Sequence, residues 1–153
     1  MSADLRATFE SALLLVPHLQ VQNANAISSP MTWGFPSITA FVGLMAALER
    51  KLGAAAGLQF NGVGVVCHRF EAQTHRGYTH SFHLSRNPVR KDGSTAGIVE
   101  EGRIHLDISL VFDVSLSSKV ADDAARQQLA QTVADLLATM RIAGGSVIAP
   151  HSP

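Results

Sequence analysis

Apolar and polar residues alternate most regularly between Ile104 and Leu116. This period of two is typical of a β-strand that buries one face and exposes the other. We expect the buried row to be Ile104, Leu106, Ile108, Leu110, Phe112, Val114 and Leu116. The exposed row would then be His105, Asp107, Ser109, Val111, Asp113 and Ser115.

Two other segments repeat apolar residues at helical spacing. The first helix is predicted over 37–52, with Ser37 as N-cap and Gly53 just after its last residue. The second is predicted from about Ser118 to Arg141, with two aspartates near its start, where the helix dipole favours them. The predicted buried stripes are Ile38, Phe41, Val42, Met45, Leu48 and Leu52 in the first helix, and Ala125, Leu129, Val133, Leu136, Leu137 and Met140 in the second.

Weaker patterns complete the expected elements. Segment 13–22 alternates weakly, and Pro17 indicates an edge or a bulge in its early part. Segment 58–72 is rich in β-forming residues, and its glycines predict either one strand with a bulge or two strands with a kink. Gly144 and Gly145 are expected to cap the second helix, before a short last strand.

The resulting order is strand, helix, strand, polar segment, strand, helix and strand, which is the βαββαβ order of the ferredoxin-like split repeat. We therefore predict the α+β class, with an antiparallel sheet and two helices on one of its faces. Residues 1–153 would form a single domain. The polar, basic segment at about 73–98 is expected to be either a functional loop or a β-hairpin arm.

Composition and charge change this picture only locally. The chain of 153 residues has a net charge of zero, which by itself argues against a free-standing nucleic-acid binder. Five cations and three histidines nevertheless lie between Arg69 and Lys91, against the single acid Glu71. A locally basic loop on a neutral protein is typical of a subunit that contacts RNA at one place and protein at others. A single cysteine, Cys67, excludes an internal disulfide and has no neighbours at metal-site spacing.

Segment 20–52 carries the most specific side chains. Asn23 and Asn25 can hydrogen-bond a base edge or a sugar hydroxyl, and Trp33 offers a flat surface for stacking. The residues alone also allow another interpretation, in which the asparagines bond turn backbone and Trp33 fills the core. Stacking on the open face of the sheet is not expected, because the exposed row has no aromatic residue and its two carboxylates repel phosphate.

The stretch QNANAISSPMTWGFPSITAFVG resembles the N-terminal signature of the Csy-two family, the Cas-five-type tail subunits of the type I-F CRISPR surveillance complex. The likeness is densest over 21–50 and continues more loosely through HRFEAQTHRGYTHSFHLSRNP and RIAGGSV. The family belongs to the RAMP superfamily of RNA-binding proteins, which is built on the ferredoxin-like fold. Its members are considerably longer, so the resemblance implies that the family's C-terminal portion is missing here.

The resemblance further implies a non-enzymatic subunit that caps the 5′ handle of the CRISPR guide RNA with the large subunit, beside the backbone subunit. Target DNA would be met only within that complex, and we expect no cofactor and no metal. The chain has no secretory signal and no apolar run long enough for a membrane helix, so we expect it in the cytoplasm. The predicted RNA-binding residues are Asn23, Asn25, Ser28, Ser29, Thr32, Trp33, Arg76, His80, Arg86, Arg90, Lys91, Gly144 and Gly145.

Two alternatives stay open. His75, His80 and His83 could include a general acid–base for RNA cleavage, which some RAMP relatives perform. Against this, the sequence shows no nucleophile and orienting partner beside them, and in type I-F systems a separate subunit processes the guide RNA. The second alternative is an incomplete gene fragment that folds only in part.

Overall fold

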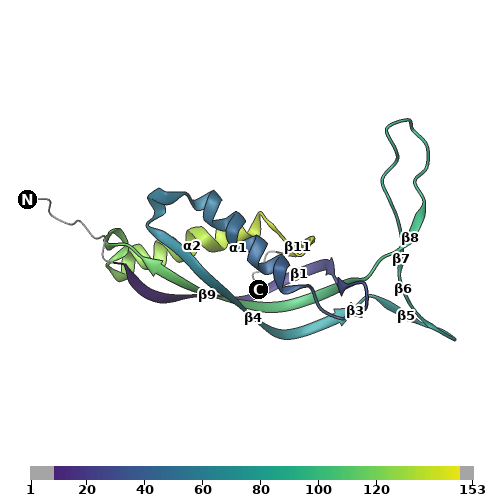
Figure 1. Ribbon diagram of the computed structural model, residues 1–153, viewed down its shortest axis with the longest axis horizontal. Helices are drawn as coiled ribbons and strands as arrows, with labels where there is room; N and C mark the ends of the chain where they lie inside the picture. Colours follow the sequence, from purple (N-terminus) through teal and green to yellow (C-terminus); the bar gives the residue numbers. More distant parts are fainter. Residues whose placement is uncertain (1–8, 149–153) are drawn as a thin grey trace, which may run out of the picture.

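The computed structural model describes residues 9–148 and shows an α+β protein with a curled antiparallel sheet and two helices (Figure 1). The sheet has five strands in the order β10-β11-β1-β9-β4, and three two-stranded ribbons accompany it. The strands of the sheet are β1 (Glu10–Asn25), β4 (Leu58–Ala72), β9 (Arg103–Leu116), β10 (Arg141–Ile142) and β11 (Gly145–Ile148). The ribbons pair β2 (Ile27–Ser29) with β3 (Thr32–Trp33), β5 (Thr74–Arg76) with β6 (His80–Phe82), and β7 (Leu84–Arg86) with β8 (Ile98–Glu100). The helices are α1 (Ile38–Leu52) and α2 (Asp123–Ala138), with short 3-10 turns η1 (Ala54–Ala56) and η2 (Ser118–Val120).

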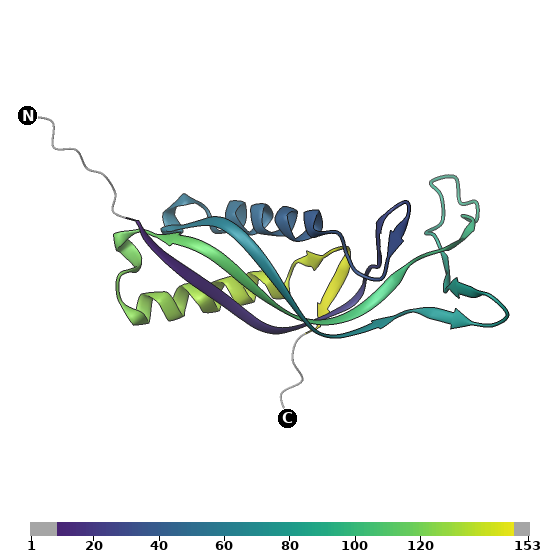
Figure 2. The same ribbon diagram turned by 60° about the horizontal axis from the view of Figure 1, so that its bottom comes forward.

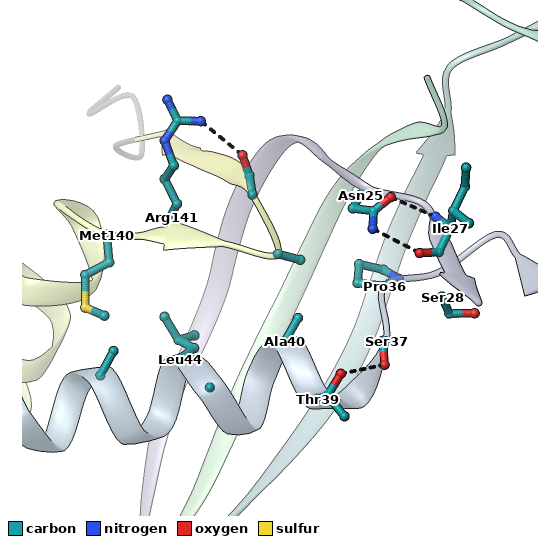
Figure 3. A pocket seen from close by; sticks show the side chains of 14 residues that line it. Asn25, Ile27, Ser28, Pro36, Ser37, Thr39, Ala40, Leu44, Met140 and Arg141 are labelled. Atoms are coloured by element: carbon teal, nitrogen blue, oxygen red, sulfur yellow. Dashed lines mark hydrogen bonds between the residues drawn. The ribbon is translucent and has the colours of Figure 1, made fainter. Parts of the chain in front are cut away.

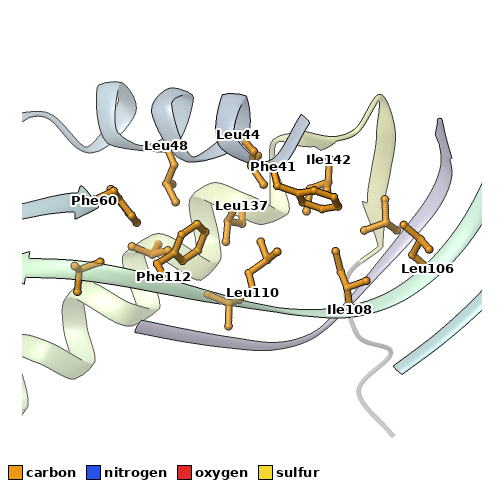
Figure 4. Close-up of a cluster of buried hydrophobic side chains, with 14 of the residues drawn as sticks. Phe41, Leu44, Leu48, Phe60, Leu106, Ile108, Leu110, Phe112, Leu137 and Ile142 are labelled. Carbon is orange, nitrogen blue, oxygen red and sulfur yellow. The ribbon is translucent and has the colours of Figure 1, made fainter. Parts of the chain in front are cut away.

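Strand β9 lies between β1 and β4, which pair with its two edges along nearly its whole length. Its predicted apolar row is buried, which confirms both the strand and its inward face. Leu48 of α1 and Leu137 of α2 point toward Phe112 and Leu110 of this row (Figure 4). The two helices therefore cover one face of the sheet, and the described residues leave the other face open.

Strands β1 and β4 are less regular than β9. The pairing of β1 with β9 shifts between Val16 and Leu19, which confirms the bulge predicted from Pro17, a residue that cannot donate to the ladder. A second shift precedes Ala24, and the strand runs on to Asn25, beyond its predicted end. Strand β4 is continuous and contains two such shifts, so one strand with bulges is the correct interpretation of its glycine-interrupted pattern.

Helix α1 lies where the sequence predicts it, but its buried stripe is rotated. Ile38 and Val42 are exposed, whereas Leu44, which the predicted stripe omits, is buried. The prediction was wrong at these positions because α1 presents the other margin of its apolar arc to the core. Among the described helices, none is both long and apolar enough to cross a membrane.

Helix α2 begins and ends inside its predicted limits, and its predicted stripe is buried or half-buried. Asp122 caps its start, since its carboxylate accepts a hydrogen bond from the Ala125 N–H at 2.7 Å. The prediction that Gly144 and Gly145 cap its end was wrong. Ala143 and Gly144, with φ of 48° and 77°, instead form the turn of the β10–β11 hairpin, because two consecutive positive φ angles suit a two-residue turn.

The polar segment folds as two short ribbons that leave one end of the sheet in different directions (Figures 1 and 2). Ribbon β5–β6 follows β4, and ribbon β7–β8 leads back into β9. This confirms the β-hairpin interpretation of the segment. We call residues 74–100 the arm.

Candidate nucleic-acid interface

A hollow of about 590 Å³ opens between the N-terminal half of α1, the β10–β11 turn and the segment that follows β1 (Figure 3). Of the residues predicted to contact RNA, Asn25, Ser28 and Gly144 line it. Arg141 lies beside them; it begins the RIAGGSV stretch of the family resemblance but was not among the predicted RNA-binding residues. Small residues of α1 keep the hollow wide, namely Ala40, Gly43 and Ala47.

A second hollow, of about 400 Å³, shares Arg141 and Gly144 with the first. It is also lined by Asn23 and by His83 and Leu84 at the base of the arm. The two hollows therefore form one continuous surface that runs from the segment after β1, past the β10–β11 turn, to the arm. The tertiary structure thus joins the three regions that the sequence pattern indicates separately.

Both polar atoms of the Asn25 side chain form hydrogen bonds within the protein. Its Nδ2 donates to the Ile27 carbonyl oxygen at 2.9 Å, and its Oδ1 accepts from the Ile27 N–H at 3.0 Å. Its backbone N–H donates to the Ala143 carbonyl at 2.8 Å. Asn25 therefore builds the turn after β1, as the structural interpretation of the asparagines predicts. One amide hydrogen and one lone pair remain for a ligand, because a carboxamide has two of each.

Asn23 has a different position. Its φ is 56°, a left-handed conformation that asparagine tolerates better than most residues. Its backbone N–H donates to His105 Nδ1 at 3.1 Å, and its carbonyl accepts from Arg103 Nη1 at 3.4 Å. Within the described part of the chain, its exposed side-chain amide makes no hydrogen bond. Asn23 therefore presents a free carboxamide to the second hollow.

The β2–β3 ribbon is held by its own hydroxyl groups. Ser28 Oγ donates to the Thr32 carbonyl at 3.2 Å, and Ser29 Oγ accepts from the Met31 N–H at 3.3 Å. These contacts place the predicted RNA-binding residues Ser28, Ser29 and Thr32 in a closed turn beside the first hollow.

Trp33, the last residue of β3, joins the β2–β3 ribbon to the arm. Its ring meets Phe82 of β6 edge-to-face, with centroids 5.2 Å apart, and it remains 54% exposed. The neighbouring Phe35 instead stacks on Phe41 of the core. Trp33 therefore packs against the arm and keeps an exposed aromatic surface, and stacking of RNA on that surface stays a prediction.

Charge is unevenly distributed along this surface. Arg103 donates to Glu101 Oε2 from Nε at 3.1 Å and from Nη2 at 2.9 Å. The neighbouring Ser85 hydroxyl and the Arg103 guanidinium lower the pKa of Glu101, so its carboxylate is charged at neutral pH and compensates Arg103. Arg141 has no carboxylate within 4 Å in residues 9–148, and it donates to the Gly144 carbonyl at 3.1 Å. Arg141 is therefore the uncompensated cation between the two hollows.

The cations of the arm are exposed and lie beyond the second hollow. No ion pair to a described carboxylate holds any of them. They remain available to a polyanion at the end of the molecule remote from η2 (Figures 1 and 2). The predicted RNA-binding residues in this group are Arg76, Arg86, Arg90 and Lys91, and the predicted residue His80 lies among them in β6.

The two glycines of the hairpin have different surroundings. Gly144 is exposed and lines both hollows. Gly145 is buried, and a Cβ atom there would lie 2.7 Å from the Gln22 carbonyl oxygen and 2.8 Å from the Ala24 nitrogen. Packing against β1 thus accounts for Gly145 without any ligand.

Comparison with known proteins identifies the family. The family model described as CRISPR-associated protein (Cas_Csy2) matches residues 14–153. The chain belongs to this family. The CRISPR-associated protein Csy2 of Pseudomonas aeruginosa (strain UCBPP-PA14) is 50% identical over 147 residues, which cover 94% of this chain and 44% of that relative. The chain therefore spans less than half the length of this curated Csy2 protein, and the resemblance found in its sequence is confirmed.

The Csy2-family match includes the whole candidate interface, because every residue from Asn23 to Gly145 lies inside the matched range. Family membership places the chain among the CRISPR-associated proteins of the type I-F system. The two hollows and the arm are therefore features of a CRISPR-associated domain.

The three arm histidines of this Csy2-family chain do not converge on one point. His75 lies opposite Ser81 and His80 opposite Arg76 in the β5–β6 ribbon, while His83 lines the second hollow. None of their three rings makes a hydrogen bond to a described residue. No group of three or more metal-ligating side chains comes together in residues 9–148.

A separate polar cluster lies on the open face of the sheet, and the sequence pattern did not indicate it. The rings of His18 and His68 stack with centroids 4.4 Å apart. His18 Nδ1 lies 3.1 Å from Asp107 Oδ1, and His68 Nε2 lies 2.7 Å from Ser109 Oγ. Ser109 was expected to be exposed, but it is buried and also accepts the His18 backbone N–H at 3.1 Å. The bulge at Pro17 brings His18 onto this face.

Proposed function

We propose that this chain is a non-catalytic, cytoplasmic, guide-RNA-binding subunit of a type I-F CRISPR surveillance complex. It caps the 5′ handle of the guide RNA together with the large subunit, beside the backbone subunit, and meets target DNA only within the complex. One observation carries the proposal. Asn25, Ser28, Asn23 and the base of the arm line two hollows that share Arg141 and Gly144, so a single strand of RNA can contact all of them.

The strand order supports a more specific proposal about the fold. The four longer strands of the sheet follow the order β11-β1-β9-β4. Each helix connects two strands that are not neighbours in this order. We propose that this is the ferredoxin-like split repeat of RAMP proteins, enlarged by the arm and the β10–β11 hairpin.

The position of the cations supports the expectation that RNA does not stack on the open face of the sheet. The open face carries the His18–Asp107 cluster, exposed leucines of β1 and Arg69 opposite Asp107, whereas Arg141 and the four cations of the arm lie at the β10–β11 turn and beyond the second hollow. Phosphate is attracted to the second group of positions. We therefore propose that RNA runs along the hollows and does not cross the sheet.

The amide roles are tested by two variants. Asn23→Gly keeps the left-handed backbone and removes only the free amide, so we expect an unchanged melting temperature and a handle-RNA affinity about 2- to 12-fold weaker, the value of one hydrogen bond. Asn25→Ala removes two contacts to Ile27 and should lower the melting temperature by roughly 2–6 °C. Melting curves and fluorescence anisotropy with handle RNA measure both effects. If Asn23→Gly binds RNA with normal affinity, the Asn23 amide is not part of the interface.

Absence of catalysis is tested directly. Labelled repeat RNA incubated with the chain should stay intact, because the three arm histidines lack a nucleophile and an orienting group. A matched His75→Ala, His80→Ala and His83→Ala triple variant should behave identically. Metal-independent cutting that is lost in this variant would establish the alternative, a RAMP-type endoribonuclease.

A further inference from the structure

The outer edge of the first half of β1 has no neighbouring strand among residues 9–148. Strand β9 pairs with one edge of β1 from Glu10 to Asn25, but β11 pairs with the other edge only at Gln20–Gln22. Among the described residues, the backbone N–H and C=O groups before Leu19 on this edge therefore face outward without strand partners. Exposed edges of this kind accept an additional strand unless they are blocked.

This edge lacks the devices that block strand addition. From Ser11 to Val16 it reads SALLLV, without a charge or a bulge. The outer edge of β4 differs, because two bulges, two glycines and charged residues such as Arg69 interrupt it. The edge of β1 is therefore the better receiver, and the bulge at Pro17 limits the added ladder to the residues before it.

Apolar surface lies on both sides of this edge. On the helix side, a groove of about 330 Å³ runs between β1 and α2, with Leu14 and Leu129 in its lining. On the open side, Leu13 and Leu15 are 74% and 58% exposed, and Leu15 pairs with Val111 of β9. An added strand would thus cover apolar side chains on both of its faces.

The length of the curated relative indicates where such a strand comes from. More than half of the Pseudomonas aeruginosa Csy2 protein lies outside the match with this chain. Each full-length protein carries one such portion for each copy of the matched segment. One portion can therefore supply the single strand that this edge can accept. A second copy of the chain is the competing occupant.

We infer that the Ser11–Val16 edge of β1 receives an uncharged, apolar strand from the part of Csy2-family proteins outside the matched segment. The pairing extends the sheet by β-augmentation and closes the groove beside α2. The inference requires no RNA, so its test is independent of the proposed function.

Amide hydrogen exchange measured by NMR tests this pairing in two proteins, the present chain and the full-length Pseudomonas aeruginosa Csy2. In the present chain, every second amide from Ser11 to Val16 should exchange rapidly, because only the inward amides bond to β9. In full-length Csy2, the matched outward amides should be protected about tenfold or more. The outward amides of β4, at Val63–Val66, provide the internal control and should exchange rapidly in both.

Two results would overturn the inference. Equal, rapid exchange of the outward β1 amides in both proteins would show that no strand is added there. Protection of these amides in the present chain, together with a dimer mass in sedimentation, would assign the edge to a second copy.

Discussion

Replacement of Arg86, Arg90 and Lys91 together by alanine is expected to reduce the salt slope of RNA binding by about two units on logarithmic axes. Each cation that neutralises a phosphate of a single strand releases about 0.7 of a counterion. The three side chains are exposed and have no carboxylate partner within the described residues. Between 50 and 200 mM salt, the variant should therefore lose about sixteen-fold less affinity than the unchanged protein.

The matched control is the triple alanine variant of Arg50, Lys51 and Lys119. These three cations are also exposed, but they lie at the end of α1 and in η2, remote from the arm (Figure 2). The control changes net charge equally and should leave the slope unchanged. Anisotropy titrations with handle and unrelated RNA at several salt concentrations measure both variants. Equal flattening in the two variants would contradict a localised arm contact.

The second large effect concerns the β10–β11 hairpin. Gly145→Ala should lower the free energy of unfolding by about 3 kcal/mol, because its Cβ would meet backbone atoms of Gln22 and Ala24 that cannot move independently of the sheet. The corresponding drop in melting temperature is roughly 6–12 °C. RNA affinity measured well below the melting temperature should fall as well, because Arg141 and Gly144 depend on this hairpin for their position.

Gly43→Ala is the control for this substitution. Gly43 lies within α1, and no heavy atom outside its own helix surroundings lies within 4 Å of the added Cβ. Alanine there should stabilise the protein by about 0.5–1 kcal/mol, because it reduces the backbone freedom of the unfolded chain. Thermal and urea unfolding compare the two. A Gly145→Ala protein that melts like the unchanged protein would show that the hairpin is not docked on β1.

Periodicity alone determined the elements that local chemistry controls. The alternation from Ile104 to Leu116 specifies a strand and its buried face, since adjacent side chains must point in opposite directions. The two helices and the bulge at Pro17 follow from equally local causes. The order of these elements was sufficient to predict an α+β sheet with two helices.

The sequence of α1 alone did not determine which of its apolar residues are buried. Its apolar arc is wider than the face that meets the sheet, so the sequence did not show whether Ile38 or Leu44 would be buried. The same limit applies to Gly144 and Gly145, because a glycine pair suits a helix end and a hairpin turn equally well. Only the docking of β11 on β1 selects the hairpin.

The candidate interface shows the same division. By sequence, Asn23 and Asn25 were equivalent, and Arg141 was not among the predicted RNA-binding residues although it begins the RIAGGSV stretch. The fold gives Asn25 two backbone partners in Ile27, leaves the Asn23 amide free, and places Arg141 between the two hollows. Residue types thus predicted which side chains are candidates for RNA binding. The bulge in β1 and the β10–β11 turn, which depend on contacts between distant segments, decided which of these candidates share a surface.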